Sequence, residues 1–291
     1  MKRLLSLSVA LVICIMLCSC GNSKPNTQIV ATTLPVYEFT VMLCAGTELT
    51  TGQLITEEVS CLHDYTLQTR QMRALENADV VVMSGAGLES FLESSITSQQ
   101  TVIDASAGIM PICTDAHQEH VDTHHHDEDP HIWLSPAHAI VMAQNIAKEL
   151  TAHYPEYQET FGRNLHNLVQ KLTELESYGK NQLDDLSCRH LITFHDGFSY
   201  LAEAFDLTII HAIEEESGSE ASAEELIHLI QLVQQNSLKA IFTEKNGSDS
   251  AAKIIAAETG TQIFQLDMAI SGESYFDAMY HNIDTLKEAL E

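Results

Sequence analysis

Basic residues are scarce in this chain of 291 residues, and cysteines show no paired motif. Only 14 Lys and Arg stand against 41 Asp and Glu, which gives a formal net charge of −27 at pH 7. Such an acidic surface favours solubility and attracts cations. Because it repels nucleic acid, we exclude nucleic acid as a partner. The seven cysteines contain no C-x-x-C. Sequence leaves the pairing of four of them open: Cys44, Cys61, Cys113 and Cys188.

Signatures of catalysis are also absent. The sequence contains no H-E-x-x-H, no G-x-x-x-x-G-K and no G-x-S-x-G. These motifs are typical of zinc hydrolases, nucleotide-binding loops and serine hydrolases. We therefore expect a binding protein and not an enzyme. A secreted metallohydrolase would need an open metal coordination position and measurable turnover.

The one long apolar run lies at the start of the chain. Lys2 and Arg3 precede an apolar stretch over residues 4–17, which is too short to span a bilayer as a helix. It ends in L-C-S-C, which resembles the lipobox of bacterial lipoproteins and implies cleavage before Cys20 and lipidation of its thiol. We interpret residues 1–20 as a signal segment and residues 21–28 as a tether. The protein is expected outside the cytoplasm, lipid-anchored to the outer face of the cytoplasmic membrane; a simple secretory signal is the alternative.

From residue 29 onward, short apolar runs alternate with amphipathic stretches. This alternation is typical of a mainly parallel sheet flanked by helices. It occurs twice, so we predict an α/β fold of two lobes, over residues 29–136 and 187–291. The expected strands are 29–33, one within 48–60, 80–83, 101–104, 190–194, 207–211, 240–243 and 262–266. The expected helices are 36–44, 67–77, 88–95, 197–204, 224–235, 248–259 and 275–290.

Residues 137–186 are expected to be helical and to join the two lobes. Ser135 and Pro136 suit the N-cap and the first position of a helix that runs to about residue 153. Pro155 begins a second helix, in which apolar residues recur at three- and four-residue spacing towards Leu183. About thirty residues at 1.5 Å each would give a rigid connector of roughly 45 Å, with a cleft between the lobes.

Histidines are concentrated between Asp115 and Pro136, beside the only tryptophan, Trp133. A short His-rich tract among carboxylates is typical of metal binding, although a solvated loop without a specific role is the alternative. We expect the loop over residues 115–129 to hold secondary metal. Its candidate ligands are His117, His120, His124, His125 and His126.

Further candidate ligands follow predicted strands. Ligands of open α/β sheets bind beyond the carboxyl ends of the strands. His195 and Asp267 directly follow two strands of the second lobe, and His63 and His131 occupy the corresponding loops of the first. Three imidazoles and one carboxylate suit tetrahedral zinc. Such a site has no open position for hydrolysis.

Several segments resemble the metal-binding solute-binding proteins of bacterial zinc and manganese ABC uptake systems. They are A-T-T-L-P-V, H-D-Y at His63, E-N-A-D-V-V-V-M-S-G-A-G-L-E-S-F-L, D-P-H-I-W-L-S-P and F-H-D-G-F at His195. The resemblance implies His63, His131 and His195 as metal ligands, with Asp267 contributing a carboxylate. Manganese-type members usually have Glu at the position of His195, and the His-rich loop is similar to that of zinc members. Both features favour zinc.

Two segments depart from the family pattern. Members often carry P-E-x-E-P-S where this chain has S-G-S-E-A-S over residues 217–222, and L-D-P-L where it has L-D-M-A at Asp267. We expect the acidic run over residues 214–216 to be a solvated face. Glu244, in F-T-E-K, is a family-like position that we expect to be structural or to touch the transporter.

The resemblance implies a monomeric receptor that captures Zn²⁺ and delivers it to an ABC-type permease. Two alternatives stay open: a manganese or iron receptor of the same fold, and an adhesin-like surface lipoprotein with a structural metal.

Overall fold

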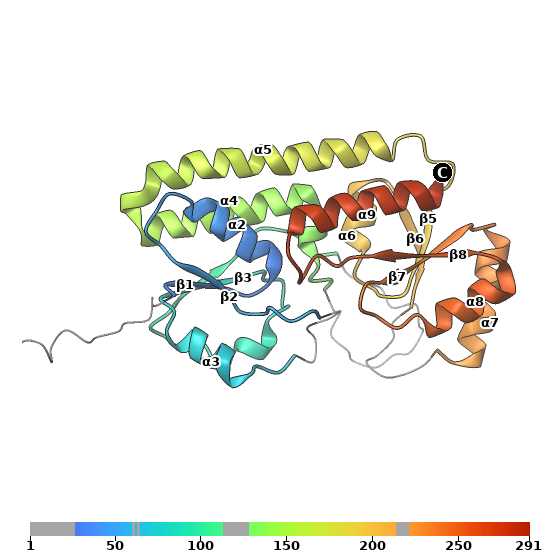
Figure 1. The fold of residues 1–291 in the computed structure, drawn as a ribbon, viewed down its shortest axis with the longest axis horizontal. Coiled ribbons are helices and arrows are strands. Elements are labelled where there is room, and N and C mark those ends of the chain that lie inside the picture. The colour runs from blue at the N-terminus through green and yellow to red at the C-terminus, as the bar shows by residue number, and fades with distance from the viewer. Residues whose placement is uncertain (1–26, 60–61, 63–64, 113–127, 214–220) are drawn as a thin grey trace, which may run out of the picture.

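The computed structural model describes residues 27–59, 62, 65–112, 128–213 and 221–291. Two four-stranded sheets lie side by side beneath a layer of long helices (Figure 1), which confirms the predicted two-lobed α/β fold. The proposed signal segment and residues 21–26 of the tether lie outside the described residues.

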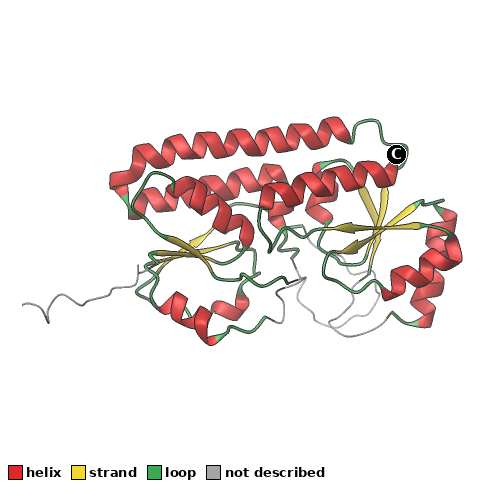
Figure 2. Ribbon diagram, in the orientation of Figure 1, coloured by secondary structure: helices red, strands yellow, loops and turns green. Residues whose placement is uncertain are grey.

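The N-terminal sheet is parallel throughout, in the order β2-β1-β3-β4. Its central strands are apolar and, apart from the half-buried Met83 at the end of β3, buried, as expected for a sheet that is covered on both faces. Helix α2 lies on one face and α3 on the other (Figures 1 and 2). The elements are β1 (Ile29–Ala31), α2 (Leu34–Cys44), β2 (Thr51–Gln53), α3 (Thr69–Glu76), β3 (Val80–Met83), the 3-10 turn η1 (Ser90–Leu92) and β4 (Thr101–Asp104).

The C-terminal sheet is also parallel and has the order β6-β5-β7-β8. Helices α7 and α8 cover its outer face, at the far end from the first lobe (Figure 1). The elements are β5 (His190–Thr193), α6 (Ser199–Ala204), β6 (Thr208–Ala212), α7 (Ala223–Gln235), β7 (Ala240–Glu244), α8 (Ser250–Thr259), β8 (Gln262–Leu266) and α9 (Tyr275–Leu290).

The helices that lie between the two sheets in the sequence differ from the prediction in one respect. After the 3-10 turn η2 (Ile132–Leu134), α4 (Pro136–His153) has the predicted bounds, and the Ser135 hydroxyl caps it by accepting from the His138 N–H. The next helix is shorter than predicted, because a separate 3-10 turn, η3 (Pro155–Tyr157), precedes α5 (Gln158–Gln182). The 25 residues of α5 span about 38 Å.

Helix α5 still joins the two lobes as predicted. It packs against α2 and α4 on the N-terminal side and against α9 on the C-terminal side, and Figure 1 shows it running above both sheets. Its buried face includes Phe161, Leu168 and Leu175, which belong to one hydrophobic cluster with residues of both lobes.

A second connection is the interlobe strap, residues 268–271, which follows β8. The Trp133 indole N–H donates to the Met268 carbonyl at 2.7 Å, and the Leu34 N–H donates to the Ile270 carbonyl at 3.0 Å. The Val59 N–H donates to the Ser271 hydroxyl at 3.2 Å. These bonds fix the end of β8 against the first lobe.

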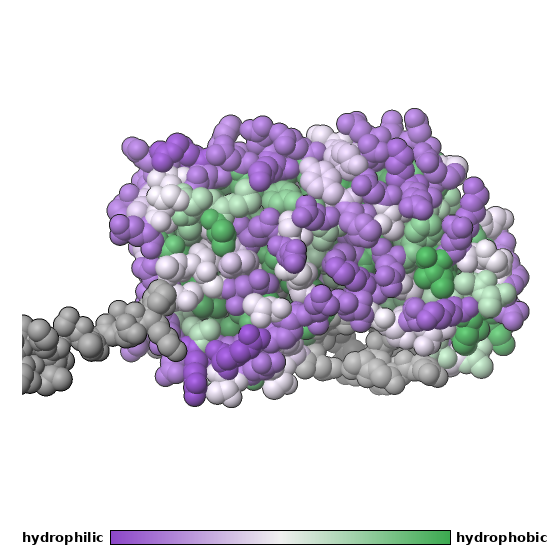
Figure 3. Space-filling view, in the orientation of Figure 1, coloured by the Kyte–Doolittle hydropathy of each residue, from purple (hydrophilic) through white to green (hydrophobic). Residues whose placement is uncertain are grey.

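Most of the visible surface is polar (Figure 3). In the described part of the chain, no helix is both long and apolar enough to cross a membrane. Cys44 and Cys188, the two cysteines in that part, are free thiols.

Candidate metal centre

His131 is buried directly before η2, with 1% of its surface exposed. Its Nδ1 lies 2.8 Å from Oδ1 of Asp129, and the same oxygen accepts from the His131 backbone N–H at 2.9 Å. This carboxylate orients the ring and favours the tautomer with the proton on Nδ1. Nε2 is therefore the nitrogen suited to bind a metal. Asp129 is not among the residues predicted for the site, although its place two residues before His131 is a signal in the sequence.

His195 lies two residues beyond the end of β5, in the other lobe. Its Nδ1 is 3.8 Å from Oε2 of Glu244, the last residue of β7, and the Glu244 side chain is only 6% exposed. A Cβ at Gly197 would lie 2.6 Å from the His195 ring and 2.7 Å from the Met268 methyl group, so a larger residue here would displace these side chains, one of which is a candidate ligand. The burial of Glu244 fits the expected structural role and leaves little of it for a transporter to touch.

The two histidines meet across the lobes. Their ring centroids are 5.3 Å apart and the ring planes are inclined by 79°. Two imidazoles on one tetrahedral zinc ion, with Zn–N distances of about 2.0–2.1 Å, have centroids roughly 5 Å apart. The separation of His131 and His195 therefore fits joint binding of one metal ion.

Asp267 lies beyond the end of β8 and has other partners. Its Oδ2 is 2.8 Å from Nζ of Lys245, and its Oδ1 accepts from the Ala269 N–H at 2.8 Å. Asn282 holds its backbone through two hydrogen bonds of 2.7 Å. Hydrogen bonding to Asp267 and its negative charge raise the pKa of Lys245. Sequence reasoning missed Lys245, for which the only signal was a lysine directly after a strand end.

The other predicted ligands lie outside the described residues. These are His63 and the loop residues His117, His120, His124, His125 and His126, and the lipidation residue Cys20 lies there too. Within the described part, no three His, Cys, Asp or Glu side chains form a group that could hold a metal ion. Among the described candidate ligands, the structure brings His131 and His195 together, with Asp129 and Glu244 beside them.

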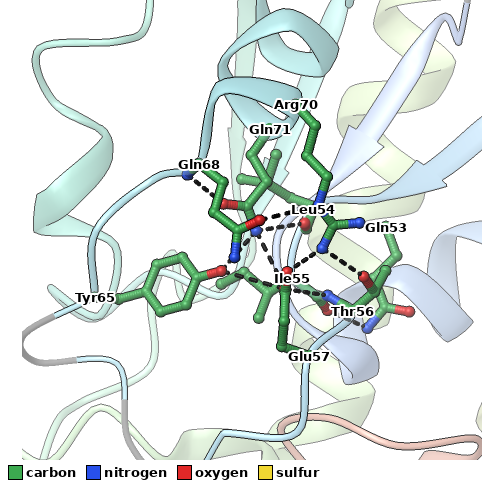
Figure 4. A network of polar contacts seen from close by, with 9 residues as sticks. All are labelled: Gln53, Leu54, Ile55, Thr56, Glu57, Tyr65, Gln68, Arg70 and Gln71. Carbon is green, nitrogen blue, oxygen red and sulfur yellow. Dashed lines mark hydrogen bonds and ion pairs between the residues drawn. The ribbon is translucent and has the colours of Figure 1, made fainter.

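The residues that flank positions 60–64 are firmly held (Figure 4). The Gln71 side-chain amide, on α3, donates to the Leu54 carbonyl at 3.0 Å and to the Tyr65 hydroxyl at 2.6 Å. That hydroxyl donates to Glu57 at 3.3 Å, and Glu57 forms an ion pair with Arg70. This network fastens both sides of the segment that contains His63 to α3.

The His-rich loop has a closed neck at Ile112 and Asp129. The Asp129 N–H donates to the Ile112 carbonyl at 3.1 Å. The buried hydroxyl of Tyr200, on α6 of the other lobe, accepts from the Ile112 N–H at 2.9 Å and donates to the Asp129 carbonyl at 3.0 Å. A residue of the C-terminal lobe thus fixes both ends of a loop that belongs to the N-terminal lobe.

Two parallel-sheet lobes joined by a long helix, with histidines facing each other between them, define a two-lobed solute-binding protein. The sequence profile of the family described as "Zinc-uptake complex component A periplasmic" (ZnuA) matches residues 29–289. The chain belongs to this family, whose members are components of transport systems.

Individual relatives agree with this assignment. The zinc-binding lipoprotein AdcA of Streptococcus pneumoniae strain R6 is 28% identical over 311 residues, covering 100% of this chain and 62% of AdcA. The chain thus spans less than two thirds of that relative's length. A crystal structure of ZnuA superposes with a TM-score of 0.79 at 26% identity, covering 91% of this chain and 100% of that one. The Zn(II)-bound ZnuA-like domain of S. pneumoniae AdcA superposes with a TM-score of 0.75 at 27% identity, covering 90% and 98%.

Proposed function

We propose that this protein is an extracytoplasmic receptor that binds Zn²⁺ between its lobes and delivers it to an ABC-type membrane permease. The observation that carries the proposal is the pair of His131 and His195, which come from opposite lobes and whose ring centroids are 5.3 Å apart. Nitrogen donors suit zinc, whereas manganese is better served by oxygen donors. Family membership and the zinc named for the AdcA relatives support the same metal.

The proposed ligand set is His63, His131, His195 and Asp267. Asp129 and Glu244 orient the two described imidazoles, and this kind of outer carboxylate commonly sets ring direction and basicity at zinc sites. The loop histidines bind further zinc more weakly and raise its concentration near the cleft. A lipid on Cys20 keeps the monomeric receptor beside its permease.

Binding and release are linked to proton uptake. An imidazole must be deprotonated to bind metal, so zinc affinity falls as pH drops from about 7.5 to about 5. The receptor captures the ion when both lobes contribute ligands to it. It delivers the ion when these ligands dissociate from it at the permease.

The test is a competitive titration of the metal-stripped protein with zinc and manganese against a chromophoric chelator. We expect one tight zinc equivalent that outcompetes manganese and is weakened by His195→Ala at least about 100-fold. His190→Ala is the matched control, because His190 is an exposed histidine at the opposite end of β5.

Three results would argue against the proposal. Weak, multiple zinc binding that His195→Ala does not change would mean that only the loop chelates metal. A preference for manganese would favour the manganese receptor. Loss of the tight zinc equivalent on deletion of residues 118–127 would reject the secondary role of the loop.

A further inference from the structure

At the ends of β7 and β8, a lysine side chain forms an ion pair with the proposed metal ligand Asp267. The two strands are parallel and in register, with Glu244 opposite Leu266. The residues that follow, Lys245 and Asp267, are therefore neighbours, and their ion pair spans 2.8 Å. Because Oδ1 of Asp267 is bonded to the Ala269 N–H, both oxygens of this carboxylate are already engaged.

The two partners differ in how firmly they are held. The Lys245 side chain is 50% exposed, whereas that of Asp267 is 14% exposed. Asn282 and Ala269 also fix Asp267 by hydrogen bonds. The ammonium group can therefore move into water at small cost while the carboxylate keeps its position.

A metal ion and the ammonium group cannot share the same carboxylate oxygen without strong repulsion. A zinc–carboxylate bond is about 2.0–2.2 Å long, so a metal on Oδ2 would lie within roughly 5 Å of an ammonium group that stayed in place. We propose that Lys245 is a built-in competitor of the metal. It neutralises Asp267 in the metal-free protein, is displaced when zinc binds, and returns to the carboxylate when zinc leaves.

This inference rests on the zinc-receptor function proposed above and adds a determinant of its affinity. The positive charge of Lys245 is opposite in sign to the net charge of the chain, which has 41 acidic and 14 basic residues. The overall charge attracts zinc, and Lys245 opposes its final coordination. Competition of this kind lowers affinity and speeds release, which suits a receptor that must pass its ion on.

Lys245→Met tests the competition, because it removes the charge and retains much of the side-chain length. In the chelator titration we expect zinc to bind roughly fivefold more tightly, the upper range for an exposed ion pair, and to dissociate more slowly. Lys245→Arg retains the cation and should bind zinc no more tightly than the wild type.

Two further variants isolate the mechanism. Lys253→Met is the matched control, because Lys253 is an exposed lysine of the same lobe that pairs with Asp249 at 2.7 Å, and it removes the same charge. Its zinc affinity should equal that of the wild type. In an Asp267→Asn background, Lys245→Met should have no further effect, since the carboxylate for which metal and lysine compete is gone.

Each contrary result overturns the inference. Unchanged or weaker zinc binding by Lys245→Met would exclude competition. An equal increase in the zinc affinity of Lys253→Met would show that the effect comes from the net charge of the protein and not from the ion pair with Asp267. If Lys245→Met still increased zinc affinity in the Asp267→Asn background, Asp267 would be excluded as the group for which zinc and the lysine compete. These outcomes leave the receptor function intact, whereas the absence of tight zinc binding by the wild-type protein would reject that function and this inference together.

Discussion

The carboxyl groups of Asp129 and Glu89 belong to residues that lie almost entirely inside the protein, with 1% and 2% of their surfaces exposed. A buried carboxylate is costly unless hydrogen bonds compensate its desolvation. Asp129 is bonded to His131 at both the ring and the backbone. Glu89 accepts from the Thr32 hydroxyl at 2.6 Å and from backbone N–H groups of the turn after β3.

Replacing Asp129 by Asn should weaken zinc binding roughly tenfold, because the amide can still accept a hydrogen bond from His131 but no longer supports the ring with a charge. The chelator titration measures this change. Asp185→Asn, at an exposed position, is the control and should leave affinity unchanged. Equal zinc affinity in the two variants would show that Asp129 does not tune the site.

Glu89 should make the stability of the fold depend on pH. Burial raises the pKa of Glu89 from its ordinary value of 4.5 to about 7. The contribution to folding is therefore fully present below about pH 4.5 and is lost as pH rises through about 7. The accompanying loss in the free energy of unfolding is at most about 3 kcal/mol.

Urea unfolding at about pH 5 and about pH 8 measures this loss. Glu89→Gln does not titrate, so its stability should fall less than that of the wild type over the same range. Glu93→Gln, at an exposed position on the following turn, should retain the wild-type pH dependence. A wild-type protein that is equally stable at both pH values would contradict the prediction.

At the scale of elements, one difference from the sequence prediction has a clear local cause. The predicted helix over residues 88–95 is only the 3-10 turn η1. Here the Glu89 side chain turns back to the Ser84 and Gly85 N–H groups, an arrangement that helical periodicity does not specify. A Cβ at Gly85 would collide with Asp104 and Ser106, so this turn also requires glycine.

Helix α6 holds the neck of the His-rich loop through Tyr200, and Tyr200→Phe should destabilise the protein by about 1–3 kcal/mol. The change leaves the half-buried Ile112 N–H and the buried Asp129 carbonyl without the hydroxyl that they share. Urea unfolding measures the effect. Tyr154→Phe is the control, because the buried Tyr154 hydroxyl has no hydrogen-bond partner in the described part of the chain. An equal loss in both variants would exclude a specific role for the neck.

At the scale of the molecule, the two lobes should unfold together. One buried hydrophobic cluster includes residues of both lobes, and a smaller one in the C-terminal lobe shares β5 and β7 with it. Helix α5 and the interlobe strap add connections. The fluorescence of Trp133 and far-UV circular dichroism should therefore change at the same urea concentration. Two separate transitions would show that the lobes are independent.

The fold could be predicted largely from local patterns. Strands β3 and β8 and helices α4 and α9 have the predicted bounds, because apolar runs, a Ser-Pro helix start and helical periodicity are local signals. The candidate ligands His131 and His195 could be proposed for a related reason, since His195 directly follows the predicted strand 190–194 and His131 lies in a distinctive motif.

The neighbours of these ligands could not be predicted in the same way. Glu244 approaches His195, and Lys245 approaches Asp267, because β7 lies between β5 and β8 in the sheet order. Periodicity gives strands but not their order. Likewise, no sequence signal relates Tyr200 to the two residues of the loop neck, which lie 88 and 71 residues earlier in the chain.

The sequence by itself determined the two α/β lobes, the acidic character, the resemblance to zinc-uptake receptors and the types of residue that could bind zinc. Only the tertiary structure decided which histidines face each other, which carboxylates lie beside them and which lysine forms an ion pair with Asp267. The physical reason is that periodicity and residue chemistry act along the chain, whereas a metal site depends on distances of a few ångströms between strand ends that only packing brings together.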